Sequence, residues 1–533
     1  MITRLTGVGR LRAVRGRSCR GEDRTRVDSP RKRPRHALKL KLFAGLLAAP
    51  LVSACVSSTP LPAPKVQPPV AFEAPRPSSE GLAPTALDRW WTLYADAQLD
   101  ALVDRALASS PDARDAIAKL EQAAAIREQN IAQLYIPTST LSATATENYT
   151  KFIESAGTIG GGAVGGGGGF LQGGAVTNLT GSFTSAWELD LWGRRRAGRD
   201  VINSDFYTAA LTFEATRISL AASVAQSLFQ ARGLALQLRD AVETARITRE
   251  LARIAGVKAK SGLGSRADQD QTAANAEAAD AQVESLTAQL TGARRTLLVL
   301  IGQGFDPLAS LEATATVGTV PPVPDQVPGE LLRRRPDIRA AESRLNSATA
   351  TLKVNELALL PTIRLNPGFT LSKNGGPFGA TTAAWSVGAN LSAPVLDRPR
   401  LLAAIRAQHA VAEQQVIAYE KAVQTAYGDT ENAFVFLASD RRRVDMLSTA
   451  ETRAKSAYDK ASLGYARGLN DLQTALSAET SWRNIRTQLT NAQATLMQRS
   501  VQVFRSLGGG WSPDQVAAAS TRAGLVASVA GEK

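Results

Sequence analysis

The chain has 533 residues, enough for two or three domains, and a formal net charge of +14. Most of this charge lies ahead of residue 55, where fourteen lysines and arginines face three acidic residues, a net of +11. Only +3 remains on the rest of the chain, so the sequence carries no basic domain and we expect no nucleic-acid partner.

Cysteine and histidine are too scarce for several kinds of active site. The cysteines are Cys19 and Cys55, and the histidines are His36 and His409. Thiol catalysis, disulfides, Cys/His zinc sites and Ser-His-Asp triads need more of these residues than a chain starting at Cys55 would keep. His409 stands in a helical pattern of Ala and Gln, which is typical of a solvated histidine. With no paired carboxylates standing out either, we expect no enzyme activity, metal or cofactor.

The N-terminal segment has the pattern of a secretory signal. Residues 36–41 (HALKLK) are basic, residues 42–52 (LFAGLLAAPLV) are apolar, and small residues lead to Cys55. The apolar run is too short to cross a bilayer core of roughly 30 Å as a helix. The cysteine after Val52-Ser53-Ala54 resembles the lipobox of bacterial lipoproteins, in which the thiol is acylated and the chain is cut before it. The alternative is an ordinary signal peptide with an incidental cysteine.

Lipidation would make Cys55 the first residue of a membrane-anchored chain. Stable anchoring needs at least two acyl chains, each contributing ~0.8 kcal/mol per buried methylene. Val56 follows, not the Asp that retains many lipoproteins in the inner membrane, so we expect delivery to the outer membrane. We therefore divide the start of the chain into a basic leader and signal, 1–54, and an acylated Pro-rich tether, 55–86.

The sequence from there on is an internal duplication. Ser110-Pro111-Asp112 corresponds to Arg335-Pro336-Asp337, and the later matches keep a nearly constant offset. These matches are Leu191-Trp192-Gly193-Arg194 with Val395-Leu396-Asp397-Arg398, Gly262-Leu263 with Gly468-Leu469, Gly302 with Gly508, and Phe305 with Trp511. We expect a first repeat at 87–309, a second at 310–511, and a disordered tail at 512–533.

Each repeat shows the same order of helix, strand pair and two long helices. Proline starts the first helix of each repeat at Pro111 or Pro336, and a later proline ends it. Long proline-free stretches rich in Ala, Leu, Glu, Gln and Arg then predict helices at 195–260, 266–301, 400–463 and 470–507. The first and last helices of a repeat together match the long one, so they could lie end to end beside it. A generic antiparallel coiled coil is the simpler alternative, but it leaves the strand pairs unexplained.

The strands alternate apolar and polar residues with a period of two. The clearest runs are 182–191, with Phe183 and Trp187, and 385–391, with Trp385; Gly-rich loops join each pair. We expect strands near 138–155, 178–192, 362–373 and 383–396. Their length suits a membrane-spanning β-barrel. Such a sheet must close on itself, because lipid offers no hydrogen-bond partners to the backbone groups of a free edge. Four strands are too few, so the chain must form a dimer, trimer or tetramer.

Together these features resemble the TolC-type outer-membrane efflux family, and most closely the lipoprotein (NodT-like) branch that serves resistance–nodulation–division pumps. The motifs are the lipobox, the duplicated Pro-Asp-Ala/Ile-Arg helix starts, Trp187-Glu-Leu-Asp-Leu-Trp-Gly-Arg194 and Tyr465-Ala-Arg-Gly-Leu-Asn470. The resemblance implies a mainly α-helical homotrimer with a twelve-stranded β-barrel in the outer membrane and a twelve-helix periplasmic tunnel. It implies as partners a periplasmic adaptor and an inner-membrane resistance–nodulation–division pump, with outer-membrane lipid around the barrel.

The resemblance also places a gate where the helices turn back at the periplasmic tip. Acidic rings in related channels make Asp471 and Asp268 candidate gate residues, and Lys260 and Arg467 candidates for ion pairs that hold the tip closed. Each exposed pair would contribute only ~0–1 kcal/mol. The first tip, Gly262-Leu-Gly-Ser-Arg266, is more basic and glycine-rich than is usual for the family. Asp471 could also simply cap the helix that follows it.

Two other functions fit parts of the same sequence. A type I protein secretion duct would share the fold, but such ducts usually lack a lipobox, so Cys55 favours small-molecule efflux. A coiled-coil envelope lipoprotein without a pore would give Trp187, Trp192 and Trp385 no lipid to face. The sequence therefore predicts a passive outer-membrane exit duct of a tripartite efflux pump.

Overall fold

The computed structural model describes residues 60–67, 69–74, 84–150, 174–316, 318–323, 328–375 and 379–511. The leader and signal, Cys55 and the tail at 512–533 lie outside the described residues, as does the end of the strand expected near 138–155.

Two long helices, one per repeat, organise the described chain. They are α4 (Arg194–Lys260, 67 residues) and α8 (Arg398–Ala466, 69 residues). At 1.5 Å per residue each is about 100 Å long. Neither contains an interior proline, and both are rich in residues of high helix propensity, so nothing in the sequence interrupts them.

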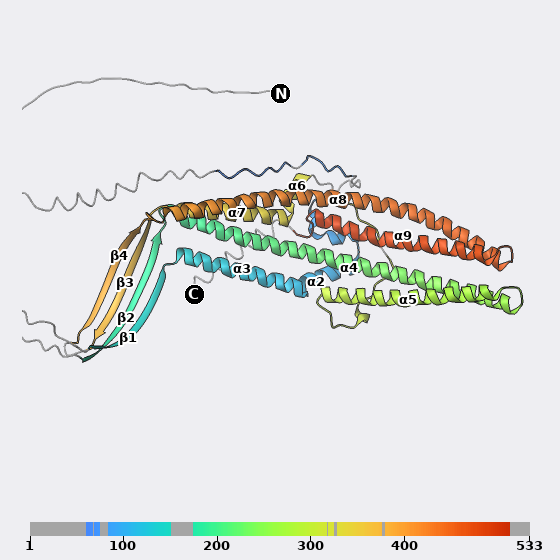
Figure 1. Cartoon of the computed structure of the whole chain (residues 1–533), viewed down its shortest axis with the longest axis horizontal. Coiled ribbons are helices and arrows are strands. Elements are labelled where there is room, and N and C mark those ends of the chain that lie inside the picture. The colour runs from blue at the N-terminus through green and yellow to red at the C-terminus, as the bar shows by residue number, and fades with distance from the viewer. Residues whose placement is uncertain are drawn as a thin grey trace, which may run out of the picture. The chain divides into compact units, whose positions relative to one another are not determined.

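Each long helix runs beside two shorter ones. α3 (Pro111–Tyr135) and α5 (Arg266–Leu300) pack against α4, whereas α7 (Pro336–Leu357) and α9 (Leu472–Ser506) pack against α8 (Figure 1). α4 also contacts α7 and α9, and these contacts join the two repeats. The end-to-end arrangement of the shorter helices follows the length relation in the sequence.

Four strands form one antiparallel sheet in the order β1-β2-β3-β4. Their bounds are Thr138–Thr150, Gly174–Leu189, Thr362–Asn374 and Thr381–Ser392. The β2–β3 pairing joins the hairpins of the two repeats. β2 and β4 end three to four residues earlier than we expect from the sequence. Gly193 in the left-handed region (φ 80°) belongs to a turn after β2, and Pro394 cannot donate a ladder hydrogen bond after β4.

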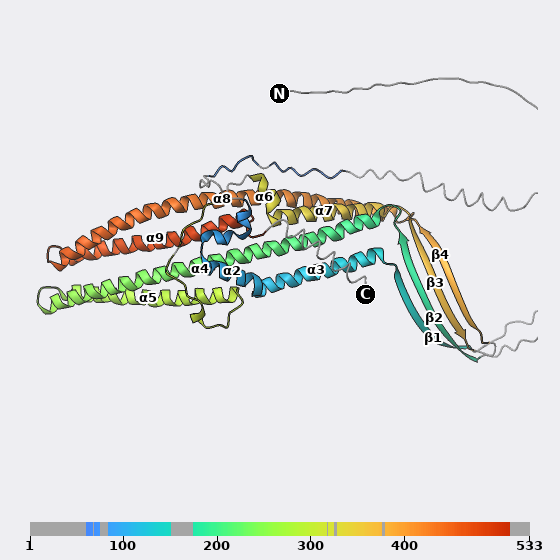
Figure 2. The same cartoon turned by 180° about the vertical axis from the view of Figure 1, so that it is seen from behind.

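The sheet and the helix turns lie at opposite ends of the long helices (Figures 1 and 2). α4 starts five residues after β2 and α8 starts six residues after β4, so both long helices begin at the sheet. They end at two tight turns, 261–265 between α4 and α5 and 467–471 between α8 and α9. Among the described residues, no helix is both long enough and apolar enough to span a bilayer.

The main core lies midway along the long helices, where short elements absent from the sequence prediction pack. These are η2 (Pro84–Tyr94), α2 (Ala97–Ser109), η3 (Leu308–Ser310) and α6 (Pro328–Arg334). Trp90 is fully buried and stacks on Phe504 with ring centroids 5.6 Å apart, and Leu99 and Leu228 are fully buried in the same cluster. This belt is where the shorter helices of each repeat meet.

Residues that match in the two repeats do not always have the same environment. Trp511 is buried and donates its indole N–H to the Arg334 carbonyl at 2.9 Å, whereas the matched Phe305 is fully exposed. After α9, Gly508 and Gly510 both take positive φ, and the Gly510 amide bonds to the Leu87 carbonyl at 2.7 Å. That second turn folds Trp511 back onto the core.

Candidate functional site

The two tips have the same backbone construction. Gly262 and Gly468 each follow the helix end with φ of 70° and 77°, a conformation that favours glycine. The next residue closes the turn, Leu263 onto the Lys258 carbonyl and Leu469 onto the Gly464 carbonyl, both at 2.8 Å. Glycine in the left-handed region with this bond is the Schellman motif, so each helix ends in a hydrogen-bonded turn that reverses the chain.

The leucines in these turns point outward. Leu263 is 81% exposed and Leu469 is 77% exposed, although both are large apolar side chains. A matched pair of exposed leucines at the ends of two helical hairpins is a feature that a binding partner could cover.

The acidic candidates both lie at helix starts. Asp471 is the N-cap of α9, and its carboxylate accepts the Thr474 backbone N–H at 2.8 Å. The hydrogen bonds with Thr474 hold the pKa of Asp471 below its ordinary value, so this carboxylate stays charged to a lower pH than a free aspartate. Asp268 lies in the first turn of α5, and Ser265 caps this helix. Burial raises the pKa of the Tyr465 phenol, and the negative charge of Asp268 raises it further.

The basic candidates lie at the turns, but the contact between the hairpins comes from a neighbour. Lys260 is the last residue of α4 and Arg467 follows α8, and both are exposed. Two residues before the end of α4, Lys258 Nζ donates to the Tyr465 carbonyl at 3.1 Å and lies 3.8 Å from the centre of the Tyr465 ring. The sequence did not point to Lys258, because no feature of the sequence distinguishes its role from that of Lys260.

Above the tip, a polar cluster joins α4 to α9. Asp240 accepts hydrogen bonds from Arg486 at 2.7 Å and from the Thr490 hydroxyl at 3.0 Å, and Gln237 donates to Asn491 at 2.7 Å. The Asp240 side chain is only 12% exposed. These contacts link the α4/α5 hairpin to the α8/α9 hairpin within one chain.

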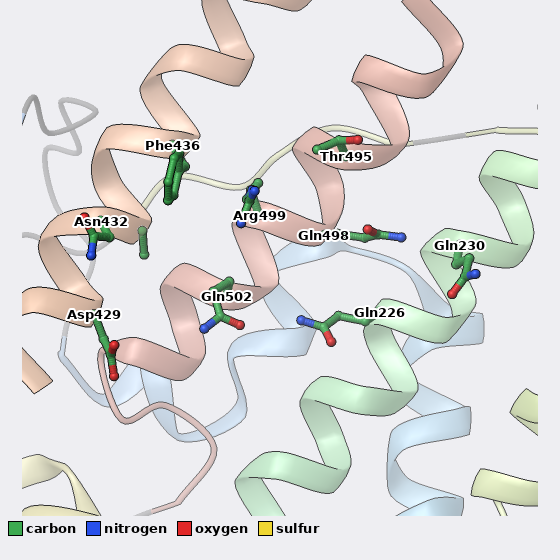
Figure 3. A pocket seen from close by; sticks show the side chains of 10 residues that line it. Gln226, Gln230, Asp429, Asn432, Phe436, Thr495, Gln498, Arg499 and Gln502 are labelled. Atoms are coloured by element: carbon green, nitrogen blue, oxygen red, sulfur yellow. The ribbon is translucent and has the colours of Figure 1, made fainter. Parts of the chain in front are cut away.

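The helices also border an open hollow lined mainly with amide groups, with Asp429 and Arg499 beside them. It has a volume of about 470 Å³ and lies between α4, α8 and α9 (Figure 3). Gln226, Gln230, Gln498 and Gln502 contribute amides, and Arg499 lies over the Phe436 ring at 4.6 Å. These groups can exchange hydrogen bonds with a polar molecule, but they do not form a nucleophile with a base.

The two faces of the sheet differ in chemistry. Leu141, Phe183, Phe369 and Trp385 lie opposite one another across all four strands and form one exposed apolar row. The next residue of each strand faces the other side, where hydroxyl pairs cross β1 and β2 at 2.7 Å and Arg364 pairs with Glu188 at 3.1 Å. The sheet is therefore apolar on one face and polar on the other.

Within the described strands, β1 and β4 are edges with one unpaired side each. They are 13 and 12 residues long, and every described side chain of either strand is exposed. Long regular edges of this kind are templates for pairing with another chain. The described residues contain no group of three or more His, Cys, Asp or Glu side chains placed to hold a metal ion.

Comparison with known proteins gives consistent results. The family model described as outer membrane efflux protein matches residues 102–303 and 327–509. The pyoverdine export outer membrane protein OpmQ of Pseudomonas putida is 28% identical over 488 residues, which are 90% of this chain and 98% of OpmQ. The toluene efflux pump outer membrane protein TtgI of Pseudomonas putida is 26% identical over 435 residues, covering 81% of this chain and 89% of TtgI. The solved outer-membrane channel OprN superposes with a TM-score of 0.70 at 26% identity, covering 85% of this chain and 98% of OprN.

Proposed function

Because the chain belongs to the outer membrane efflux protein family and is an outer-membrane exit duct of an efflux pump, we propose that it works as a passive homotrimeric channel for small molecules. A resistance–nodulation–division pump in the inner membrane would load the channel through a periplasmic adaptor. Acylation at Cys55 would add a lipid anchor; this residue lies outside the described part of the chain. No step of catalysis belongs to this proposal.

The two-faced sheet with free edges carries the proposal. An apolar face suits lipid, a polar face suits a water-filled lumen, and unpaired edges in a bilayer cost several kcal/mol for each unsatisfied group. Pairing β4 of one chain with β1 of the next removes both edges. Three copies give twelve strands, enough to enclose a lumen, and the long helices extend the same passage away from the sheet.

The relatives support a small-molecule cargo. OpmQ is named for pyoverdine export and TtgI for toluene efflux. We propose that the present channel also conducts small molecules. They would pass its hydroxyl and amide groups without chemical change. The exposed Leu263 and Leu469 at the tips are the surface that we propose for the adaptor.

A pair of neighbouring substitutions tests the orientation of the sheet. Phe369→Arg places a charge in the apolar row, which costs about 2–4 kcal/mol near the middle of a bilayer, so we expect loss of outer-membrane insertion. Thr370→Arg places the same charge on the polar face, so we expect normal insertion and a shift toward anion preference. Heat-modifiable trimer in outer-membrane fractions and single-channel recordings measure the two effects. Equal loss of insertion in both variants would contradict the assignment of the faces.

Asp471 is proposed to contribute negative charge at the gate in addition to capping α9. We expect Asp471→Ala to lower the cation preference of single channels in planar bilayers, since a trimer would lose three carboxylates. Asp471→Ser serves as the control, because serine can still accept the Thr474 N–H but carries no charge. The same loss of selectivity in both variants supports the gate role. Normal selectivity in Asp471→Ser would reduce Asp471 to a helix cap.

A further inference from the structure

Part of the N-terminal tether is bound to the side of α8. The Glu431 carboxylate accepts the backbone N–H groups of Glu73 at 2.7 Å and Ala74 at 3.0 Å. The Tyr427 hydroxyl donates to the same carboxylate at 2.8 Å. A single side chain on α8 thus holds two consecutive amides of the tether.

An aromatic contact secures the same point. Phe72 is only 6% exposed, stacks on Tyr427 with ring centroids 5.8 Å apart, and meets the Phe434 ring edge-on at 5.4 Å. Ala74 is also buried, whereas Val70, two residues before Phe72, is 92% exposed. The burial is therefore selective, and Phe72 with Ala74 and Glu431 forms a defined clasp.

The bound segment runs toward the sheet as it approaches Cys55. Ahead of the clasp, the Lys65 amide donates to Glu420 at 2.6 Å, so the earlier tether residue contacts an earlier residue of α8. The described part of the tether follows α8 in the same direction in Figure 1. Glu420 lies twenty-two residues beyond Arg398, the first residue of α8, a distance of about 33 Å along the helix.

The remaining chain has almost the same length. Cys55 is ten residues before Lys65, and ten residues reach at most about 33–36 Å when fully extended. Pro60, Pro62 and Pro64 favour extended backbone over residues 60–64. An acyl group on Cys55 can therefore just reach the start of α8, where the sheet begins.

We propose that the tether acts as a ruler. Because the clasp fixes the length of free chain after Cys55, it sets the height of the sheet relative to the membrane surface that holds the acyl chains. This inference rests on the proposed lipidation at Cys55 and on the outer-membrane position of the sheet. A chain that is taut when clasped aligns the sheet with the bilayer before the trimer closes. Without the clasp and the Lys65 contact, the tether would be fixed only from Leu87 and Trp90 onward, more than twenty residues after Lys65, where both side chains are fully buried.

The test changes tether length and clasp separately in the full chain. Deleting residues 57–60 keeps Cys55-Val56 and shortens the reach by about 13–14 Å, so we expect several-fold less heat-modifiable trimer in the outer membrane. Inserting four Gly/Ser residues after Ser57 should leave the amount unchanged. Adding Phe72→Ala, Glu420→Ala and Glu431→Ala to the deletion removes the clasp and the acceptor of the Lys65 amide, and should restore most of the trimer. Val70→Ala, at an exposed position of the same segment, should not restore it.

Three further measurements separate this inference from its premise. Palmitate labelling of wild type and Cys55→Ala reports acylation, and hydrogen exchange at the Glu73 and Ala74 amides reports release of the clasp. Single-channel conductance of the purified deletion variant should equal that of wild type, since the pore does not use the tether; lack of conductance in every variant would contradict the channel proposal alone. A harmless deletion, a deletion that clasp release does not rescue, or a wild type without acyl label would overturn the ruler.

Discussion

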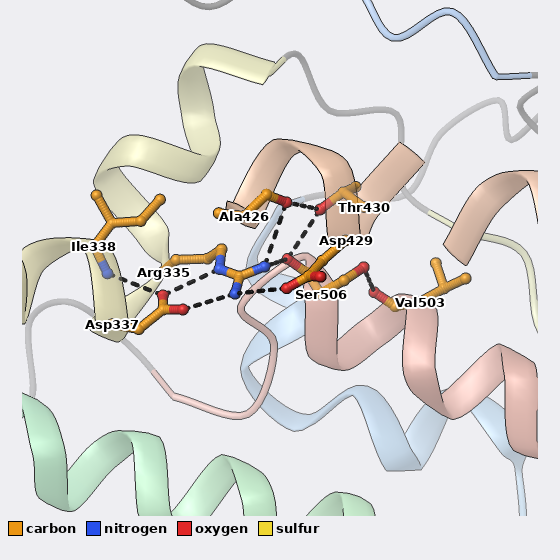
Figure 4. A network of polar contacts seen from close by, with 8 residues as sticks. All are labelled: Arg335, Asp337, Ile338, Ala426, Asp429, Thr430, Val503 and Ser506. Carbon is orange, nitrogen blue, oxygen red and sulfur yellow. Dashed lines mark hydrogen bonds and ion pairs between the residues drawn. The ribbon is translucent and has the colours of Figure 1, made fainter. Parts of the chain in front are cut away.

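Replacing Arg335 by methionine should lower the free energy of unfolding by about 1–3 kcal/mol, the usual cost of leaving buried hydrogen-bond partners without their donor. Arg335 is 9% exposed and lies where α7 begins, beside α8 and the end of α9 (Figure 4). Its guanidinium donates to Asp337 at 2.7 and 3.0 Å and to the Ser506 carbonyl at 3.1 Å, and lies 3.7 Å from Asp429. One side chain therefore joins three helices of the second repeat.

The same substitution should change how stability depends on pH. Burial favours the neutral form of Asp337, but the hydrogen bonds from Arg335 outweigh it and hold the pKa of Asp337 below its ordinary value. A carboxylate with a depressed folded-state pKa stabilises the fold above its ordinary pKa, and the contribution is lost as pH falls through the depressed value. Without Arg335 this contribution is absent, so the stability difference between wild type and Arg335→Met should be largest near neutral pH and should shrink as pH falls through the depressed pKa.

Thermal and chemical unfolding of the detergent-solubilised protein measure both effects. Arg344→Met is the matched control, because Arg344 is an exposed arginine on the same helix and its loss should cost less than about 0.5 kcal/mol. If Arg335→Met unfolds like Arg344→Met, the network at the start of α7 contributes little to stability and the belt is held by its aromatic core alone.

The fold class and the efflux function were predictable from sequence, because they depend on patterns that survive without tertiary context. Pro111 and Pro336 mark helix starts, and the period of two around Phe183 and Trp385 marks strands. Likewise, Gly262 and Gly468 mark turns that need positive φ. The membership of the efflux family and the helix-and-sheet fold, both expected from these motifs, are confirmed.

Contacts between residues far apart in sequence were not predictable. α2 buries Leu99, Leu102, Val103 and Ala106 at helical spacing, a pattern that the sequence does contain, whereas the stacking of Trp90 on Phe504 is a contact that the sequence does not announce. Ser110 and Arg335 occupy matched positions, yet Ser110 caps its helix through Ala113 whereas Arg335 joins three helices. Lys258, not Lys260, reaches across to Tyr465, a difference of two residues that decides which side of α4 a side chain occupies.

Replacing Asp240 by alanine should raise the open probability of the channel, and this is the largest effect on gating that we expect. Asp240 is the carboxylate that joins α4 to Arg486 and Thr490 of α9, so its loss separates the two helical hairpins. Leaving a partly buried donor unpaired costs about 1–3 kcal/mol, which shifts a two-state equilibrium roughly 5-fold to 150-fold. Single-channel recordings and entry of large antibiotics into intact cells measure the change.

Asp280→Ala separates this prediction from a general loss of charge. Asp280 pairs with Arg249, but that pair joins α4 to α5 inside one hairpin, so its removal should leave the open probability unchanged. Lys258→Met should act in the same direction as Asp240→Ala, since Lys258 also joins the two hairpins at the tip. If Asp280→Ala opens the channel as much as Asp240→Ala, the hairpins do not move against each other in opening. If only Asp240→Ala and Lys258→Met open it, the boundary between the two hairpins is the surface along which the gate moves.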